Sequence, residues 1–150
     1  MASKISILGS TGSIGVNALE VISNLKKSFE VRYLYTNKNV DLLISQIKEH
    51  KPKSVAVVDE LAAEKIKSAL DEMGIELLIG KVGLLDLSQR HDIDLVLNGL
   101  VGASGMQPTI NAIKAGVDVA LANKESLVCS GMLVTKLAQK KKCKNFTYRF

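Results

Sequence analysis

Residues 5–15 read ISILGSTGSIG, an apolar run followed directly by three glycines spaced three residues apart. The run is typical of a buried β-strand, and the residues after it carry apolar side chains at the period of a helix. A strand-to-helix turn requires glycine where φ is positive and where the backbone approaches a pyrophosphate without a Cβ in between, and Gly9, Gly12 and Gly15 fit those needs. The stretch therefore predicts a phosphate-binding turn, although a tight turn without a ligand has the same pattern.

Strand-like apolar runs alternate with helix-period segments along nearly the whole chain, which is the pattern of repeated βα units. The expected strands are residues 4–8, 30–35, 54–58, 76–79, 95–98 and 117–121. With right-handed crossovers they predict an α/β fold, a single domain on a doubly wound, Rossmann-like parallel sheet with helices on both faces. The ligand of such a sheet lies across the carboxyl ends of the strands, where the unusual polar stretches of this sequence also fall.

Backbone groups in and after the glycine turn are expected to hold the anion. The first N–H groups of a helix point at such a ligand, at the positive end of the helix dipole. The hydroxyls of Thr11 and Ser13 can add donors.

The end of the second expected strand distinguishes NADPH from NADH. A protein that prefers NADH usually places Asp or Glu there to bind the ribose hydroxyls. Here residues 36–39 read TNKN, and the next acidic residue is Asp41. Lys38 and the amides of Asn37 and Asn39 would instead receive a 2′-phosphate, so the sequence favours NADPH, with a solvated loop lysine as the alternative.

A second polar cluster, Asn123, Lys124 and Glu125, follows the last expected strand and begins a helix. This position directs an amide and a cation into the cleft where a nicotinamide and its substrate would meet. An N-capped helix with solvated charges explains the same residues, and spacing alone does not choose between the two. The glycines and the proline of residues 102–108 are equally compatible with a simple loop and helix start.

Charge and composition argue against several classes of protein. The net charge is +5, but 14 Lys and Arg face 15 Asp and Glu over residues 1–125, so the basic excess lies in the tail and no nucleic-acid partner is expected. Two cysteines without ligand or disulfide spacing indicate a reducing, cytoplasmic location. The uncharged runs are too rich in glycine and polar residues for a signal peptide or a membrane span, so a soluble protein without a membrane partner is expected.

Four stretches in order, GSTGSIG, NKNV, NGLVGASGMQPT and LANKESLV, closely resemble 1-deoxy-D-xylulose 5-phosphate reductoisomerase. LANKESLV is the most specific of them, and the resemblance covers about residues 5–131. It implies the N-terminal NADPH-binding domain of an oxidoreductase and isomerase of non-mevalonate isoprenoid biosynthesis. Full-length members convert the phosphosugar 1-deoxy-D-xylulose 5-phosphate to 2-C-methyl-D-erythritol 4-phosphate with NADPH and Mg²⁺ or Mn²⁺, and they are homodimers.

The resemblance also implies a role for the polar residues singled out above. Those against the cofactor pyrophosphate are Thr11, Gly12, Ser13 and Ile14. Those at its adenosine end are Lys38 and Asn39, and those beside the nicotinamide are Asn123 and Glu125. Lys124 would reach the substrate as the catalytic residue of this chain. Asn37 departs from the glycine of many members, although asparagine tolerates positive φ better than most residues.

The tail departs from the family after about residue 144. Family members continue into a strand and an acidic, metal-binding motif, whereas residues 140–150 read KKKCKNFTYRF, so no metal ligand is expected here. Residues 144–150 can be back-translated with one allowed choice of codons. Deleting a single A from that nucleotide sequence shifts the reading frame, and the new frame encodes Lys-Ile-Leu-Pro-Ile-Asp, as in the family. We therefore expect an NADPH-binding domain over residues 1–131, then a helix end and basic tail over 132–150, truncated by a frameshift before the catalytic and C-terminal domains. Resequencing of the gene across this tract tests the hypothesis.

A fragment of this kind is expected to bind NADPH without turnover, because nothing in it would polarise the substrate carbonyl. Two alternatives stay open. One is a free-standing NADPH-binding module with a genuine tail. The other is the cofactor domain of a semialdehyde or homoserine-type dehydrogenase, which would not be expected to carry LANKESLV.

Overall fold

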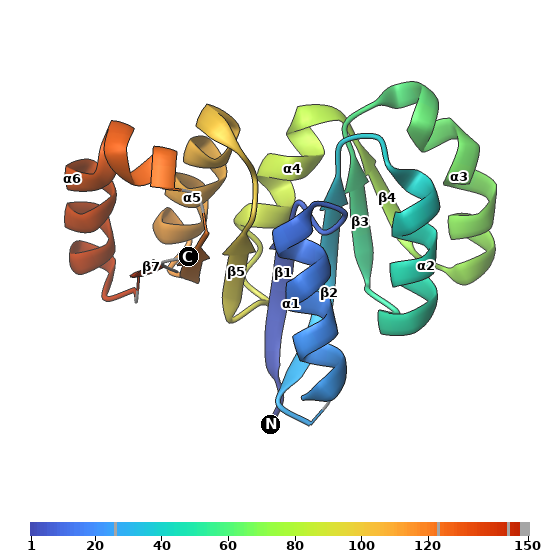
Figure 1. The fold of residues 1–150 in the computed structure, drawn as a ribbon, viewed down its shortest axis with the longest axis horizontal. Helices are drawn as coiled ribbons and strands as arrows, with labels where there is room; N and C mark the ends of the chain where they lie inside the picture. The colour runs from blue at the N-terminus through green and yellow to red at the C-terminus, as the bar shows by residue number, and fades with distance from the viewer. Residues whose placement is uncertain (26, 123, 144, 148–150) are drawn as a thin grey trace.

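The computed structural model of the chain describes residues 1–25, 27–122, 124–143 and 145–147. Within these residues the strands form one parallel sheet of seven, in the order β4-β3-β2-β1-β5-β6-β7. They are β1 (Ser3–Leu8), β2 (Phe29–Thr36), β3 (Ser54–Val57), β4 (Glu76–Ile79), β5 (Leu95–Asn98), β6 (Asp118–Leu121) and β7 (Asn145–Thr147). In Figure 1 the sheet runs from β4 on the right to β7 on the left, and the direction of strand addition reverses between β1 and β5.

Helices cover both faces of this sheet, as the sequence predicts. They are α1 (Ser13–Asn24), α2 (Val40–His50), α3 (Glu60–Met73), α4 (Gly80–Ser88), α5 (Met106–Lys114) and α6 (Lys124–Lys141), with a short 3₁₀ helix, η1 (Gly102–Gly105), before α5. The first three pack on one face, where Leu19, Leu43 and Ile66 are buried together. The last three pack on the other, around Leu87 and Ile113. Two separate apolar cores thus confirm the doubly wound α/β fold.

The strand β7 is the main difference from the sequence-based expectation, which has six strands and a basic tail after the last helix. The observed β7 runs parallel to β6, with Val119 opposite Asn145 and Leu121 opposite Thr147. The physical reason is that the outer edge of β6 presents unpaired N–H and C=O groups that a further strand satisfies. Charge and local periodicity do not reveal such a long-range requirement.

A polar cluster stabilises the amino ends of β3 and β4. The Tyr33 hydroxyl donates to Asp92 at 2.6 Å, and the Arg90 guanidinium lies 4.9 Å from the Tyr33 ring centre while donating to Glu76 at 2.8 Å. The Tyr33 hydroxyl lowers the pKa of Asp92, and Arg90 lowers the pKa of Glu76. Both carboxyls therefore favour the folded state above their ordinary pKa values and lose this contribution as the pH falls through the lowered ones.

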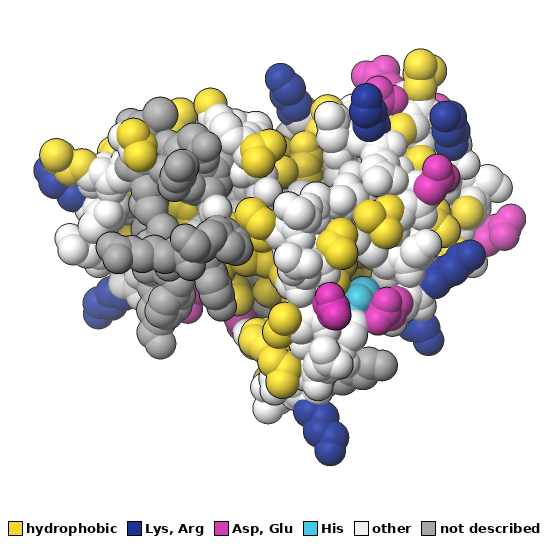
Figure 2. Space-filling view, in the orientation of Figure 1, with side chains coloured by type: hydrophobic (Ala, Val, Ile, Leu, Met, Phe, Trp, Pro, Cys, Tyr) yellow, Lys and Arg dark blue, Asp and Glu magenta, His cyan; other side chains and the backbone are white. Residues whose placement is uncertain are grey.

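Charged side chains are spread over the surface. Figure 2 shows the Lys and Arg side chains of the described residues dispersed around the rim of one face, without a basic patch. In the described parts of the chain, no helix is long and apolar enough to cross a bilayer.

Candidate functional site

The glycine turn lies between β1 and α1, at the carboxyl end of the sheet. Gly9 takes a φ of +84°, which L side chains rarely adopt. The N–H groups of Gly9 and Ser10 both donate to the Tyr35 carbonyl of β2, at 3.2 and 2.9 Å, and the N–H of Gly12 donates to Gly9 at 3.1 Å. The turn is therefore tied to the end of the neighbouring strand before α1 begins.

The first turn of α1 presents free donors. Gly12 is the N-cap residue and supplies no side-chain cap, and the first turn carries no acidic residue. The first N–H groups of a helix have no hydrogen-bond partner within the helix. Those of α1 are therefore available to a ligand beside the turn. The Thr11 hydroxyl lies 2.6 Å from that of Thr36, and because one such bond uses one hydrogen, the pair keeps one O–H for a ligand.

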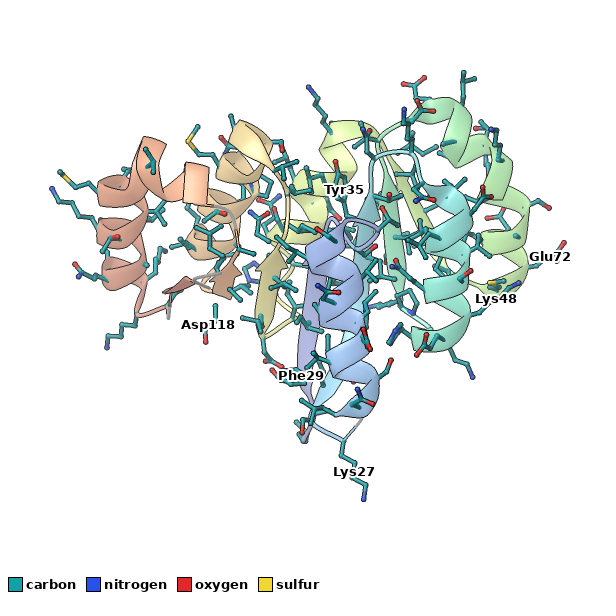
Figure 3. The ribbon with its side chains drawn as sticks, in the orientation of Figure 1. Lys27, Phe29, Tyr35, Lys48, Glu72 and Asp118 are labelled. Carbon is teal, nitrogen blue, oxygen red and sulfur yellow. The ribbon has the colours of Figure 1, made fainter. Side chains whose placement is uncertain are left out.

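A cleft of about 630 Å³ opens beside this turn. Its walls are residues 9 and 11–14 of the turn, Tyr35 and Asn37 at the end of β2, the start of α4, and the loop from Gly99 into α5. Figure 3 places Tyr35 at one end of the sheet and Phe29 and Asp118, which begin their strands, near the other. The cleft thus lies at the carboxyl ends of the strands and at the switch point between β1 and β5, where ligands bind in such sheets.

The residues of the loop after β2 have different roles. Of its described residues, Asn37 lines the cleft, whereas Lys38 is exposed and is not one of the lining residues. The Asn39 side chain caps α2, because its Oδ1 accepts a hydrogen bond from the N–H of Leu42 at 3.3 Å. The Nδ2 donors of Asn39 are not used by this cap.

The second polar cluster is only partly described. Asn123 lies outside the described residues, and so do the side chains of Lys124 and Glu125, although these two residues begin α6. No cluster of three His, Cys, Asp or Glu side chains that could hold a metal ion occurs in the described part of the chain.

Sequence reasoning assigned no role to two residues at this site, Lys81 in the lining of the cleft and Asn98 behind it. Lys81 lies in the first turn of α4, is exposed, lines the cleft and forms no ion pair with any described residue. Asn98 ends β5 and is fully buried; its Nδ2 donates to Gly105 at 2.7 Å and to Thr109 at 2.8 Å. In the sequence, Asn98 begins the stretch NGLVGASGMQPT that carries part of the resemblance, whereas nothing in the sequence marks Lys81.

Comparison with protein-family models identifies the chain. Residues 5–131 match the model described as 1-deoxy-D-xylulose 5-phosphate reductoisomerase. The chain belongs to this reductoisomerase family. The reductoisomerase of Chloroherpeton thalassium is 45% identical over 141 residues, which are 94% of this chain and 36% of that relative. The reductoisomerase of Caldanaerobacter subterraneus subsp. tengcongensis is 48% identical over 139 residues, 93% of this chain and 36% of that relative. The chain thus spans about a third of the length of these relatives.

Solved reductoisomerases share the fold. The enzyme from Zymomonas mobilis in complex with NADPH superposes with a TM-score of 0.91 at 29% identity, covering 98% of this chain and 38% of that one. A DOX-P reductoisomerase in complex with NADPH, fosmidomycin and magnesium gives 0.89 at 31% identity, covering 97% and 36%. A homoserine dehydrogenase from Thiobacillus denitrificans gives 0.60 at 19% identity, covering 98% and 29%. That last likeness extends to the fold alone, which leaves the homoserine-type alternative without a family match.

Proposed function

We propose that this chain is the NADPH-binding part of a 1-deoxy-D-xylulose 5-phosphate reductoisomerase. The observation that carries the proposal is the glycine turn, whose backbone leaves no room for a Cβ at Gly15 and whose free N–H groups face a cleft at the switch point. Such a cradle fits the pyrophosphate of a dinucleotide. The family membership and the NADPH complexes of its solved members support the same cofactor.

Each site residue expected from the sequence has a proposed part in holding the cofactor. The pyrophosphate would lie on the turn residues Gly9, Thr11, Gly12, Ser13, Ile14 and Gly15. Its adenosine end would lie near Asn37, Lys38 and Asn39, and its nicotinamide near Asn123 and Glu125. Lys124 would contact the substrate. When bound, NADPH supplies the hydride, and the residues of this chain bind and orient it.

The complete reaction belongs to the longer family protein. It would convert 1-deoxy-D-xylulose 5-phosphate to 2-C-methyl-D-erythritol 4-phosphate in the cytoplasm, as a homodimer, with Mg²⁺ or Mn²⁺ polarising the carbonyl. The acidic motif that holds this ion in the family does not occur in these 150 residues. We therefore propose residues 1–131 as the NADPH-binding domain and expect binding without turnover from the 150-residue chain.

A fluorescence titration of the purified chain tests this proposal. NADPH is expected to bind saturably and more tightly than NADH, because no carboxylate stands at the end of β2 to repel a 2′-phosphate. Incubation with NADPH, substrate and Mg²⁺ is expected to leave the NADPH absorbance unchanged. Absence of NADPH binding would contradict the proposed cofactor, and consumption of NADPH would contradict the expected lack of turnover.

Lys81→Gln is expected to weaken NADPH binding about three- to tenfold and to change NADH binding less than about twofold. The reason is that Lys81 brings an unpaired cation to the cleft that Asn37 also lines, and the 2′-phosphate of NADPH would lie near Asn37. Lys81→Arg keeps the charge and is expected to keep the preference. Lys65→Gln, an exposed position on α3, serves as the matched control. Equal losses for both cofactors would show that Lys81 does not recognise the phosphate.

A further inference from the structure

Gln46 is a buried polar residue of α2, with 7% of its surface exposed. Its Nε2 donates to the Ser10 carbonyl at 2.7 Å, whereas its Oε1 is sealed from solvent and has no hydrogen-bond partner among the described residues. An unsatisfied buried oxygen destabilises a fold. An apolar side chain of similar shape would remove this unsatisfied oxygen but would also leave the buried Ser10 carbonyl without its donor. What Gln46 adds to the fold is therefore the fixed orientation of the Ser10 carbonyl.

All three polar groups of Ser10 are fixed by their neighbours. Its N–H donates to the Tyr35 carbonyl at 2.9 Å, and its hydroxyl donates to the same carbonyl at 3.3 Å. Its own carbonyl accepts the bond from Gln46. The C=O and N–H of a trans peptide unit point in opposite directions, so fixing the Ser10 carbonyl toward α2 turns the N–H of Thr11 away from α2. Thr11 lines the cleft, and its N–H makes no hydrogen bond to a described residue.

We infer that Gln46 is a positioning residue for the cofactor. By holding the Ser10 carbonyl it keeps the N–H of Thr11 directed into the cleft, where the pyrophosphate of NADPH would bind. The inference rests on the proposed NADPH-binding function. Gln46 acts through Ser10 and touches no ligand. A donor that is already oriented binds more tightly, because the peptide loses no further freedom when the ligand arrives.

The first variant that tests this role is Gln46→Met, which removes the donor and the unsatisfied oxygen while keeping the length of the side chain. Loss of the bond to Ser10 lowers the free energy of unfolding, and loss of the unsatisfied buried oxygen raises it. The denaturant midpoint is therefore expected to stay close to that of the parent. NADPH affinity is expected to fall about tenfold. Gln139→Met, the same change at an exposed site on α6, is the control and is expected to match the parent in both measurements.

The second variant, Gln46→Glu, adds a readout that a purely structural residue would not move. Only the protonated carboxyl can donate to the Ser10 carbonyl, and burial raises the pKa of a carboxyl. The NADPH affinity of this variant, divided by that of Gln46→Met at the same pH, is expected to rise as the pH falls from 8.5 to 6. The titration of the NADPH phosphate changes the affinity of both variants equally, so its effect cancels in this ratio.

The outcomes separate this inference from the proposed function. If the parent binds no NADPH, the proposed function fails. If the parent binds NADPH and Gln46→Met keeps its affinity within about twofold, only the role of Gln46 is overturned. If Gln46→Met does not fold, the pH profile of Gln46→Glu against the parent decides, and a flat profile overturns the inference.

Discussion

The substitution Gly15→Ala is expected to lower the free energy of unfolding by about 3 kcal/mol and to abolish measurable NADPH binding. Gly15 lies in the first turn of α1, where helix propensity alone would favour alanine by about 1 kcal/mol. A Cβ at this position would lie 2.5 Å from the Ser10 Cα and would also collide with the Gly9 carbonyl oxygen. Both are backbone atoms, so no side-chain rotation relieves the contact and the turn has to open.

Chemical denaturation and NADPH titration of the same preparations measure the two effects. Gly131→Ala provides the matched control, since Gly131 also lies in a helix and a Cβ there meets nothing within 4 Å. This control is expected to be as stable as the parent or more stable by up to about 1 kcal/mol. A gain of stability at both positions would show that the turn is looser than described and that packing does not require Gly15.

The fold and the glycine turn could be predicted because their signals are local. The apolar run before Gly9 and the spacing of Gly9, Gly12 and Gly15 report on neighbouring residues of one chain segment. The cap of α3 at Gly74, where φ is +68°, is another local feature, because glycine adopts positive φ without strain. Each of these depends on backbone conformation within a few residues, which the residue type itself restricts.

Residues that act across the sheet could not be predicted in this way. Gln46 contacts Ser10 across 36 positions, and β7 depends on an edge that β6 leaves unpaired. Lys81 reaches the cleft because α4 crosses from the β4 edge to the other face of the sheet. Asn39, expected at the adenosine end, is also used as the cap of α2. In each case a tertiary arrangement assigns a role that composition and spacing leave open.

Asn98 lies behind the wall of the cleft that the loop between β5 and α5 forms. The Nδ2 of Asn98 joins the end of β5 to the start of α5 by donating to Gly105 and Thr109. Its Oδ1 accepts a hydrogen bond from the N–H of Leu100, in the loop between them, at 3.2 Å. The loop between β5 and α5 lines the cleft, so Asn98 fixes one wall as the bonds of Ser10 fix the other. The wall is therefore held by one fully buried amide.

Asn98→Asp is accordingly expected to destabilise the chain by about 3 kcal/mol at pH 7 and to weaken NADPH binding. The change is nearly isosteric, but it removes both Nδ2 donors and places a buried carboxylate against the Gly105 carbonyl. Burial raises the pKa of the introduced carboxyl above its unfolded value, so the loss of stability grows as the pH rises through the unfolded pKa and shrinks below it. Denaturation at pH 5 and pH 7 measures this difference. Asn24→Asp, at an exposed position ending α1, is expected to cost no more than a few tenths of a kcal/mol. Equal stability of the two variants at pH 7 would contradict the role given to Asn98, because only one of the two amides is buried and bonded on both sides.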